Sequence, residues 1–282
     1  MDMNETKTRF LKMHGCGNDL IYFDGMSIQN PEILAVKLSD RNKSIGGDGI
    51  VLILPSVMAD AKMRMFNADG SEGMMCGNSI RCVGKYLHDH GIVESLHMEI
   101  ETSSGIKQLE LIRHGNKVTA AKVDMGQAEI SPEKIPVNLT GAMVVARPVT
   151  IAGNTYEITC VNMGNPHAII FTNDLAHFNL VAIGAAFENS DLFPEGVNLG
   201  VVQMASRNHM QMRVWERGAG ETKASGTGAC AAAVAAVLMG YADKDTSIEV
   251  AVEGGILTIE YTDAAVYMTG DCVTIYEGMV EL

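Results

Sequence analysis

The sequence predicts an α/β (α+β) fold made of two related halves. Three observations predict it: short glycine-containing motifs recur about half a chain apart, several runs are β-rich or alternate apolar and polar residues, and two helical segments are bounded by glycine. The chain has 282 residues, a length that suits two domains of roughly 150 residues each. We therefore expect two α/β domains packed closely.

The internal repeat consists of four pairs of matching positions. First half before second, they are Gly17-Asn18 and Gly164-Asn165, Gly70-Ser71-Glu72 and Gly220-Glu221, Cys76-Gly77 and Ser225-Gly226, and Gly91 and Gly240. The offset is 147 in the first pair (165 − 18) and 149 in the others (221 − 72, 225 − 76, 240 − 91). Four matches at nearly one offset indicate two structurally related halves.

Seven segments have the composition or alternation of strands. They are residues 49–55, 62–67, 97–102, 107–113, 117–125, 167–172 and 210–216. Ser103-Ser104-Gly105 separates two of them and predicts a hairpin turn. Since strands occur in both halves, each half is expected to contain a sheet.

Four segments have helical patterns, at about residues 30–39, 77–90, 181–188 and 226–239. The second and the fourth begin just after Cys76 and Ser225. Both stop at a glycine that suits a left-handed cap.

The domain boundary has no low-complexity linker, and residues 126–136 are the expected crossing between the halves. We expect residues 1–128 together with 271–282 to form an N-terminal α/β domain that carries Cys76. Residues 129–270 are then a C-terminal α/β domain that carries Ser225.

The charge balance is acidic, with a net charge of 21 − 34 = −13. It disfavours nucleic acid and anionic membrane surfaces as partners, since both need clustered Lys and Arg. The longest apolar run, residues 228–240, is shorter than the ~18 residues that a membrane-spanning helix needs. Because the N-terminus also lacks the pattern of a secretory signal, we expect a cytoplasmic protein.

Cofactor chemistry has little support in the sequence. The six cysteines include no CxxC pair, so reduced thiols are expected, and the eight histidines show no HExxH spacing. Lys223 is better interpreted as a solvated loop lysine than as a Schiff-base lysine, and Gly218-Ala219-Gly220 lacks the full GxGxxG motif. We expect neither a metal nor an organic cofactor.

The starts of the two glycine-led helices are the first candidate site. A helix N-terminus exposes unpaired N–H groups and partial positive charge, so it binds carboxylates and favours thiolate over thiol. The glycines that follow Cys76 and Ser225 let a ligand approach the backbone. The alternative is that each is only a small buried residue that opens a helix.

Polar residues next to glycine form a second candidate set. They lie in the segments HGCGND (14–19), FNADG (66–70), NMGNPH (162–167), NLG (198–200) and ERGAG (216–220). An Asn beside Gly often marks only a turn. Arg217 differs, because it follows an apolar strand and opens a glycine loop, a place that suits a bidentate grip on a carboxylate. The alternative for Glu216 and Arg217 is a surface ion pair.

Five segments together resemble those of diaminopimelate epimerases, in the same order and at similar spacing over nearly the whole chain. They read MHGCGND, FNADGSEGMMCGNSIRC, VNMGNPH, GVNLG and ERGAGETKASGTGAC. The resemblance implies two pseudo-symmetric domains, each a mixed, mostly antiparallel sheet wrapped around a central helix, with the active site in the cleft between them. It also implies a homodimer.

The reaction that this resemblance implies is the epimerisation of LL-2,6-diaminopimelate to the meso form, a step in lysine and peptidoglycan precursor biosynthesis that needs no pyridoxal phosphate. Two cysteines act on opposite faces of Cα, one as base and one as acid. The matching positions here are Cys76 and Ser225, with His167 and Glu216 as candidates for tuning the pair. The implied substrate contacts are Asn18, Asn67, Gly77, Asn78, Asn165, Asn198, Glu216, Arg217, Gly226 and Thr227. Of these, Gly77, Asn78, Gly226 and Thr227 offer backbone donors to the α-carboxylate, and the asparagines other than Asn78, together with Arg217, contact the distal end.

Two positions depart from the family pattern. Ser225 stands where the second catalytic cysteine is expected, and a hydroxyl is a far weaker acid than a thiol. We therefore expect a poor epimerase, either through an engineered replacement, which the matching neighbours of Ser225 favour, or through natural divergence. Ser79 adds a side chain where many members have glycine, which leaves the substrate open.

Two rival functions stay open. One is another cofactor-independent amino-acid racemase of this fold, acting for example on histidine. The other is a non-catalytic amino-acid-binding relative, for which Ser225 is the support. Arg217 and the four distal asparagines favour a substrate that carries a second amino-acid head.

Overall fold

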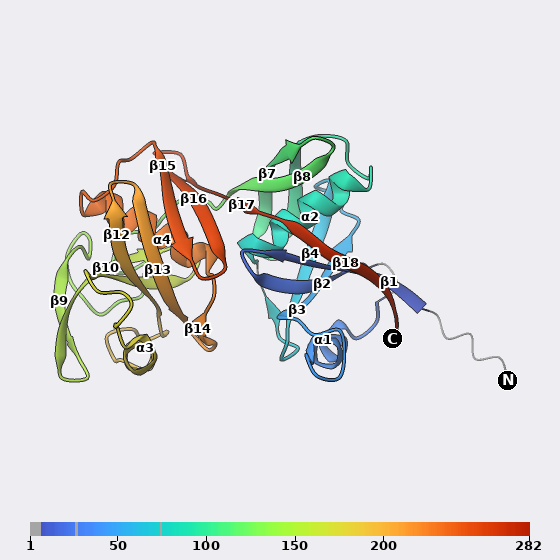
Figure 1. Cartoon of the computed structure of the whole chain (residues 1–282). Coiled ribbons are helices and arrows are strands. Elements are labelled where there is room, and N and C mark those ends of the chain that lie inside the picture. The colour runs from blue at the N-terminus through green and yellow to red at the C-terminus, as the bar shows by residue number, and fades with distance from the viewer. Residues whose placement is uncertain (1–6, 26–27, 74) are drawn as a thin grey trace. The chain divides into compact units, whose positions relative to one another are not determined.

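The computed structural model describes residues 7–25, 28–73 and 75–282. The chain divides into two compact units (Figure 1). Unit 1 comprises Met1–Val123 and Gly270–Leu282, and unit 2 comprises Asp124–Thr269. Each unit is a sheet wrapped around one central helix, as the family resemblance implies.

Unit 1 contains helices α1 and α2 and a sheet with the strand order β18-β1-β2-β3-β4-β6-β7-β8. The β2–β3 and β4–β6 pairings are parallel and the others are antiparallel, and the short β5 pairs with β4. The bounds are β1 Lys7–Gly15, β2 Asn18–Asp24, α1 Pro31–Ser39, β3 Gly49–Leu54, β4 Ala61–Asn67, β5 Glu72–Gly73, α2 Gly77–Asp89, β6 His97–Thr102, β7 Gly105–His114, β8 Lys117–Asp124 and β18 Val273–Glu281.

Helix α2 is the core of unit 1. Its residues from Gly77 to Leu87 are all buried, and it contacts β1, β2, β6 and β7. Gly84 allows the sheet to approach, since a Cβ there would lie 2.9 Å from Leu111 Cδ2. The helix ends before Gly91, whose φ of +67° is the predicted left-handed cap.

Unit 2 contains helices α3 and α4 and a sheet with the strand order β9-β10-β11-β12-β13-β15-β16-β17. Again two pairings are parallel, β11–β12 and β13–β15, and the short β14 pairs with β13. The bounds are β9 Arg147–Ile151, β10 Asn154–Asn162, β11 Pro166–Phe171, α3 Leu180–Glu188, β12 Asn198–Ser206, β13 His209–Glu216, β14 Gly220–Thr222, α4 Gly226–Leu238, β15 Ser247–Val252, β16 Gly255–Tyr261 and β17 Val266–Asp271.

The two sheets have matching strand orders, with the C-terminal β18 in the place that β9 holds in unit 2, which confirms the predicted repeat. Corresponding starts are 149 residues apart for α2 and α4 (226 − 77), for β3 and β12 (198 − 49) and for β8 and β17 (266 − 117). The central helix of unit 2 is α4, which contacts β10, β11, β12, β13, β15 and β16. Alanines and Cys230 fill its buried stretch, so the sheet packs close to the helix axis.

All four predicted helices and all seven predicted strands are present, within two residues at each end. The predicted hairpin turn is present too, because Thr102 pairs with Gly105 across it. Strands with weaker local signals were not predicted; they include β1, β2, β10, β12 and β18. Tertiary partners stabilise these strands, as in β18, whose residues pair with β1 from Lys7↔Glu281 to His14↔Val273.

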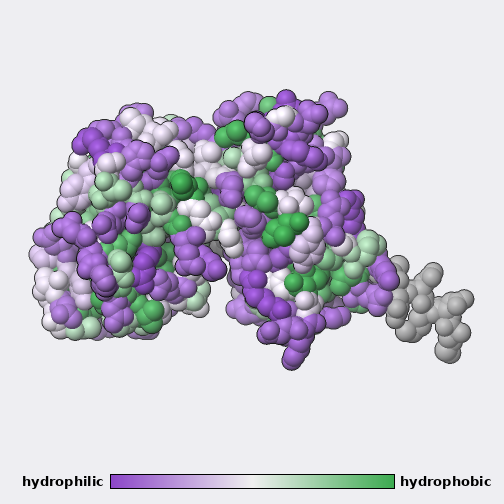
Figure 2. All heavy atoms as spheres, in the orientation of Figure 1, coloured by the Kyte–Doolittle hydropathy of each residue, from purple (hydrophilic) through white to green (hydrophobic). Residues whose placement is uncertain are grey.

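Figure 2 shows hydrophilic residues over most of the face in view, with separate hydrophobic patches. The core of unit 2 gathers Ile158, Phe187, Leu199 and Val201, all fully buried. No helix within the described ranges is long and apolar enough to cross a membrane.

Candidate active site

The two helix N-termini have almost the same backbone geometry. Cys76 is the N-cap of α2 with φ −132° and ψ 117°, and Ser225 is the N-cap of α4 with φ −127° and ψ 115°. In each helix the N-cap carbonyl accepts the first helical bond, from Ile80 N at 3.0 Å and from Ala229 N at 2.9 Å. The first N–H groups after each cap therefore stay outside the helical ladder and can bind an anion.

The side chain of Cys76 is half-buried and lies against Asn18. Its Sγ is 3.6 Å from Asn18 Oδ1. The other five cysteines are buried. Burial raises the pKa of the Cys16 thiol to about 11 and that of Cys82 to about 12, which disfavours their reactive thiolates. Cys76 is thus the cysteine of this chain that is suited to acid–base chemistry.

A fully buried arginine supports the start of α2. Arg81 Nε donates to Asp271 O at 3.0 Å, and its two NH groups donate to Gly77 O at 3.0 Å and to Asn78 Oδ1 at 3.1 Å. Gly77 and Asn78 are the predicted carboxylate-binding positions. Arg81 holds the carbonyl of Gly77 and the side chain of Asn78. The backbone N–H groups of these two residues therefore remain available to a ligand.

Asn67 lies at the end of β4, where the chain turns toward α2. Its Nδ2 donates to Ser71 Oγ at 2.9 Å, and its backbone N donates to Ser71 O at 2.8 Å. The side chain is half-buried. Among the predicted residues, unit 1 thus brings Cys76 directly against Asn18, and it holds Asn67 in a separate turn.

In unit 2, Ser225 is bound to Glu216. Ser225 Oγ donates to Glu216 Oε2 at 2.9 Å and accepts from Gly228 N at 3.4 Å. Thr222 Oγ1 donates to the other carboxylate oxygen, Glu216 Oε1. Glu216 therefore holds the side chain at position 225 instead of forming the surface ion pair that was its alternative.

Two of the predicted binding residues of unit 2, Asn198 and Arg217, are joined by a hydrogen bond. Arg217 N donates to Asn198 Oδ1 at 3.0 Å, and Asn198 Nδ2 donates to Pro166 O at 2.8 Å. Arg217 NH1 donates to Glu195 O, and its aliphatic chain covers Gly196, where a Cβ would lie 2.8 Å from Arg217 Cδ. Glu188 Oε1 accepts from Gly218 N at 2.8 Å and orders the loop after Arg217.

Sequence comparisons identify relatives over almost the whole chain. The family model described as diaminopimelate epimerase matches residues 10–131 and 159–275. The chain belongs to the diaminopimelate epimerase family. A diaminopimelate epimerase from Desulfovibrio desulfuricans is 51% identical over 280 residues, covering 96% of this chain and 97% of that protein. One from Acetivibrio thermocellus is 48% identical over 278 residues, covering 97% and 99%.

Solved structures of distant sequence share the fold. A hydroxyproline epimerase from Agrobacterium vitis has a TM-score of 0.75 at 14% identity and covers 100% of this chain and 94% of its own. A probable proline racemase from Agrobacterium radiobacter has a TM-score of 0.74 at 15% identity, covering 98% and 93%. The two-domain fold of this epimerase family member is therefore one that racemases and epimerases use.

His167 is buried on β11 of the family fold and bonds to Asn165. Its Nε2 lies 2.8 Å from Asn165 Oδ1, and its Nδ1 is buried with no hydrogen-bond partner among the described residues. Burial, together with the positive charge of Arg217, lowers the pKa of His167 to about 3. The imidazole is therefore neutral near pH 7 and orients the Asn165 amide; its role in tuning the thiol pair stays a prediction.

Ser79, which departs from the family pattern, is fully buried, and its Oγ donates to Met65 Sδ at 3.4 Å. Its hydroxyl is therefore occupied inside unit 1.

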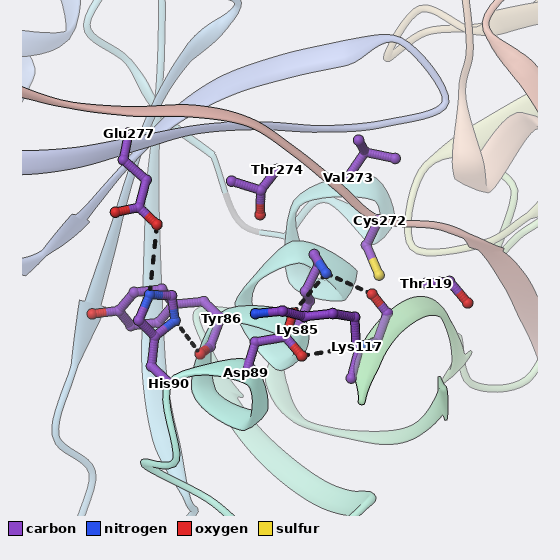
Figure 3. A pocket seen from close by; sticks show the side chains of 11 residues that line it. Lys85, Tyr86, Asp89, His90, Lys117, Thr119, Cys272, Val273, Thr274 and Glu277 are labelled. Atoms are coloured by element: carbon purple, nitrogen blue, oxygen red, sulfur yellow. Dashed lines mark hydrogen bonds and ion pairs between the residues drawn. The ribbon is translucent and has the colours of Figure 1, made fainter. Parts of the chain in front are cut away.

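A cavity of about 370 Å³ lies at the other end of α2, away from the predicted site residues (Figure 3). There Lys85 Nζ is already bound to Asp89 Oδ2 at 2.7 Å and to Val118 O at 2.6 Å.

Asp48 and Glu188 were not predicted as site residues. Glu188 had no local signal, because its role depends on Trp215 and Gly218, which are distant in sequence. Asp48 had a local sequence signal, because it lies in the run Gly46-Gly47-Asp48-Gly49 just before a buried strand. Glycine on both sides of an acidic residue indicates that its backbone lies close to other chain segments.

Proposed function

We propose that this chain, an isomerase by family, is built to epimerise LL-diaminopimelate to meso-diaminopimelate by proton transfer at Cα, without pyridoxal phosphate. The observation that carries the proposal is the pair of N-caps at Cys76 and position 225, which share one backbone geometry in two repeated units. Two-base epimerisation needs such a pair, with one group on each face of Cα.

The helix N-termini supply the electrostatic part of the reaction. Removal of the α-proton spreads negative charge onto the α-carboxylate. The N–H groups of Gly77 and Asn78 on α2, and of Gly226 and Thr227 on α4, are suited to stabilise that charge. Since these donors are preorganised by the fold, they need no rearrangement as the charge develops.

Substrate recognition is assigned to the side chains beyond the two caps. Arg217 N donates to Asn198 Oδ1, and Asn165 Oδ1 lies 2.8 Å from His167 Nε2. A guanidinium, together with amides that can donate and accept, matches a distal group with both a carboxylate and an ammonium. Asn18 and Asn67 are proposed to complete this recognition.

Ser225 makes the present chain a poor catalyst under this proposal. A serine hydroxyl is a much weaker acid than a thiol, and Glu216 already accepts its hydrogen. An engineered Cys→Ser replacement or natural divergence would produce the same chain. A non-catalytic amino-acid-binding protein is the second candidate, and Ser225 is the observation that favours it.

The test is a substrate panel on the Ser225→Cys variant, under reducing conditions and without added cofactor. LL-diaminopimelate, L-histidine and L-proline are incubated in deuterium oxide, and deuterium uptake at Cα is followed by mass spectrometry. Uptake and stereoinversion for diaminopimelate alone support the proposal. Turnover of histidine instead moves the assignment to another racemase, and binding without exchange favours the non-catalytic candidate. Cytoplasmic location and the homodimer stay predictions.

A further inference from the structure

Asp48 lies at the centre of a set of side-chain contacts in unit 1. It belongs to none of the motifs that indicate the candidate site residues. Its side chain accepts from Asn18 Nδ2 at 3.0 Å and from Asp19 N at 3.0 Å, both at Oδ2. Arg41 NH2 donates to the other oxygen, Oδ1, at 2.8 Å. We propose that Asp48 is a positioning residue that locks the amide of Asn18, so that the carbonyl oxygen of Asn18 faces Cys76.

The orientation of the Asn18 amide follows from the chemistry of the amide and of the Asp48 carboxylate. An ionised carboxylate only accepts hydrogen bonds, so the amide group that faces Asp48 must be the NH2. A flipped Asn18 would place its carbonyl oxygen against the carboxylate. With Nδ2 held at Asp48, the Oδ1 atom is the one that lies 3.6 Å from Cys76 Sγ. The sulfur therefore meets an acceptor, which suits an S–H hydrogen.

The backbone around Asp48 is fixed independently of its side chain. Asp48 N donates to Asp19 O at 2.8 Å, and Asp48 O accepts from Ala68 N at 3.2 Å, next to Asn67. The flanking glycines permit these approaches: a Cβ on Gly47 would lie 3.0 Å from Asp19 O, and one on Gly49 2.1 Å from Phe66 O. Asp48 thus joins the two segments of unit 1 that carry predicted substrate contacts.

A charged network holds the carboxylate in place. Arg41 bridges Asp48 and Asp19, and Asp19 also pairs with the buried Lys12 at 2.6 Å. Although burial raises the pKa of Asp19, hydrogen bonds from Arg41 and Lys12 outweigh it and hold that pKa below its ordinary value. Asp19 therefore stays ionised near pH 7 and keeps Arg41 beside Asp48.

The variant Asp48→Asn removes the lock and keeps the backbone contacts. An asparagine supplies only one oxygen, for which Arg41 competes with Asn18 Nδ2 and Asp19 N, so the hold on the Asn18 amide is weakened and its donor can turn toward Cys76. Asp243→Asn is the matched control: Asp243 in unit 2 also bonds an arginine, Arg207, and accepts from an asparagine amide, Asn208 Nδ2, at 3.3 Å. It lies beyond the C-terminal end of α4, at the opposite end from Ser225.

The first readout is the rate at which iodoacetamide alkylates Cys76 in the chain as it stands, measured by mass spectrometry. The other five cysteines are buried, so the reaction reports on Cys76. Alkylation consumes the thiolate, and an acceptor that holds the S–H hydrogen slows it. We expect Asp48→Asn and Asn18→Ala to raise the rate by about threefold each, as the loss of one weak hydrogen bond allows, and Asp243→Asn to leave it unchanged.

A double-mutant cycle separates positioning from a general structural effect. If Asp48 acts through Asn18, adding Asp48→Asn to Asn18→Ala produces no further change in the alkylation rate. An equal effect of Asp48→Asn in both backgrounds, or a rate equal to that of the Asp243→Asn control, overturns the inference. This readout does not depend on epimerase activity.

The second readout rests on the proposed function and uses the Ser225→Cys background. There Asp48→Asn is expected to lower kcat/KM about tenfold, because the Asn18 amide that Asp48 holds faces the reacting sulfur and is also a proposed substrate contact. If Ser225→Cys alone has no epimerase activity, the proposed function fails while the alkylation result still decides the role of Asp48. If it is active and Asp48→Asn is as active, the positioning role is refuted.

Discussion

Replacing Ser225 by cysteine should change activity and stability in opposite directions. A thiol ionises far more readily than an alcohol, and a well-placed general acid or base contributes about 10²–10⁴ in rate. We expect Ser225→Cys to raise kcat for LL-to-meso conversion by at least about 100-fold. The fold already places a carboxylate, Glu216, 2.9 Å from the atom that is exchanged.

The expected loss of stability comes from the helix cap. Ser225 Oγ accepts from Gly228 N, and a thiol is a weaker acceptor, so the free energy of unfolding should fall by about 1 kcal/mol. The site is 4% exposed, and the larger sulfur adds a small packing penalty. In a unit of this size, such a loss lowers Tm by about 3 °C.

The matched variant in unit 1, Cys76→Ser, should have the opposite effects on stability and activity. Cys76 has the same N-cap dihedrals as Ser225 but makes no side-chain cap hydrogen bond. Cys76→Ser should therefore add a cap, raise the free energy of unfolding by up to about 1 kcal/mol and abolish the activity of the Ser225→Cys background.

The assays are chromatographic separation of LL and meso isomers and differential scanning calorimetry, both in reducing buffer. The reasoning is refuted if Ser225→Cys folds and remains inactive towards diaminopimelate. It is also refuted if Ser225→Cys raises Tm while Cys76→Ser lowers it, since the caps would then not have the roles that the two geometries indicate.

Three further predictions concern stability. His167 has a folded-state pKa of about 3, below its unfolded value near 6.5; its contribution is therefore complete above pH 6.5 and is lost as the pH falls toward 3, at about 1.4 kcal/mol per pH unit. Urea unfolding of His167→Gln should lack that part of the acid sensitivity, and equal slopes for both proteins would contradict the assignment. Arg81→Met should destabilise unit 1 by about 3 kcal/mol or more, because it strands buried acceptors; a thermal melt that is unchanged would show that Arg81 is dispensable. Gly49→Ala should cost several times as much as the control Gly91→Ala, since a Cβ at Gly49 meets Phe66 O at 2.1 Å and one at Gly91 meets nothing within 4 Å; similar Tm losses would contradict the close contact.

Local chemistry explains what could be predicted from the sequence. The helices around Cys76 and Ser225 are bounded by glycines with defined caps, and α2 and α4 begin at Gly77 and Gly226 as expected. The strands with strong alternation were predicted for the same reason, because their signal lies within one short segment. The family motifs are also local, so the family and the candidate residues could be recognised without coordinates.

Contacts between distant segments account for the rest. The C-terminal strand β18 has both faces partly exposed and is defined by its pairing with β1, more than 250 residues earlier in the chain. The neutrality of His167 depends on complete burial, and the orientation of Asn18 depends on Asp48, 30 residues further on. Motif spacing thus indicated the candidate site residues. The protonation state of the imidazole and the direction of the amide were decided by tertiary structure, because desolvation and hydrogen-bond partners exist only once the chain has folded.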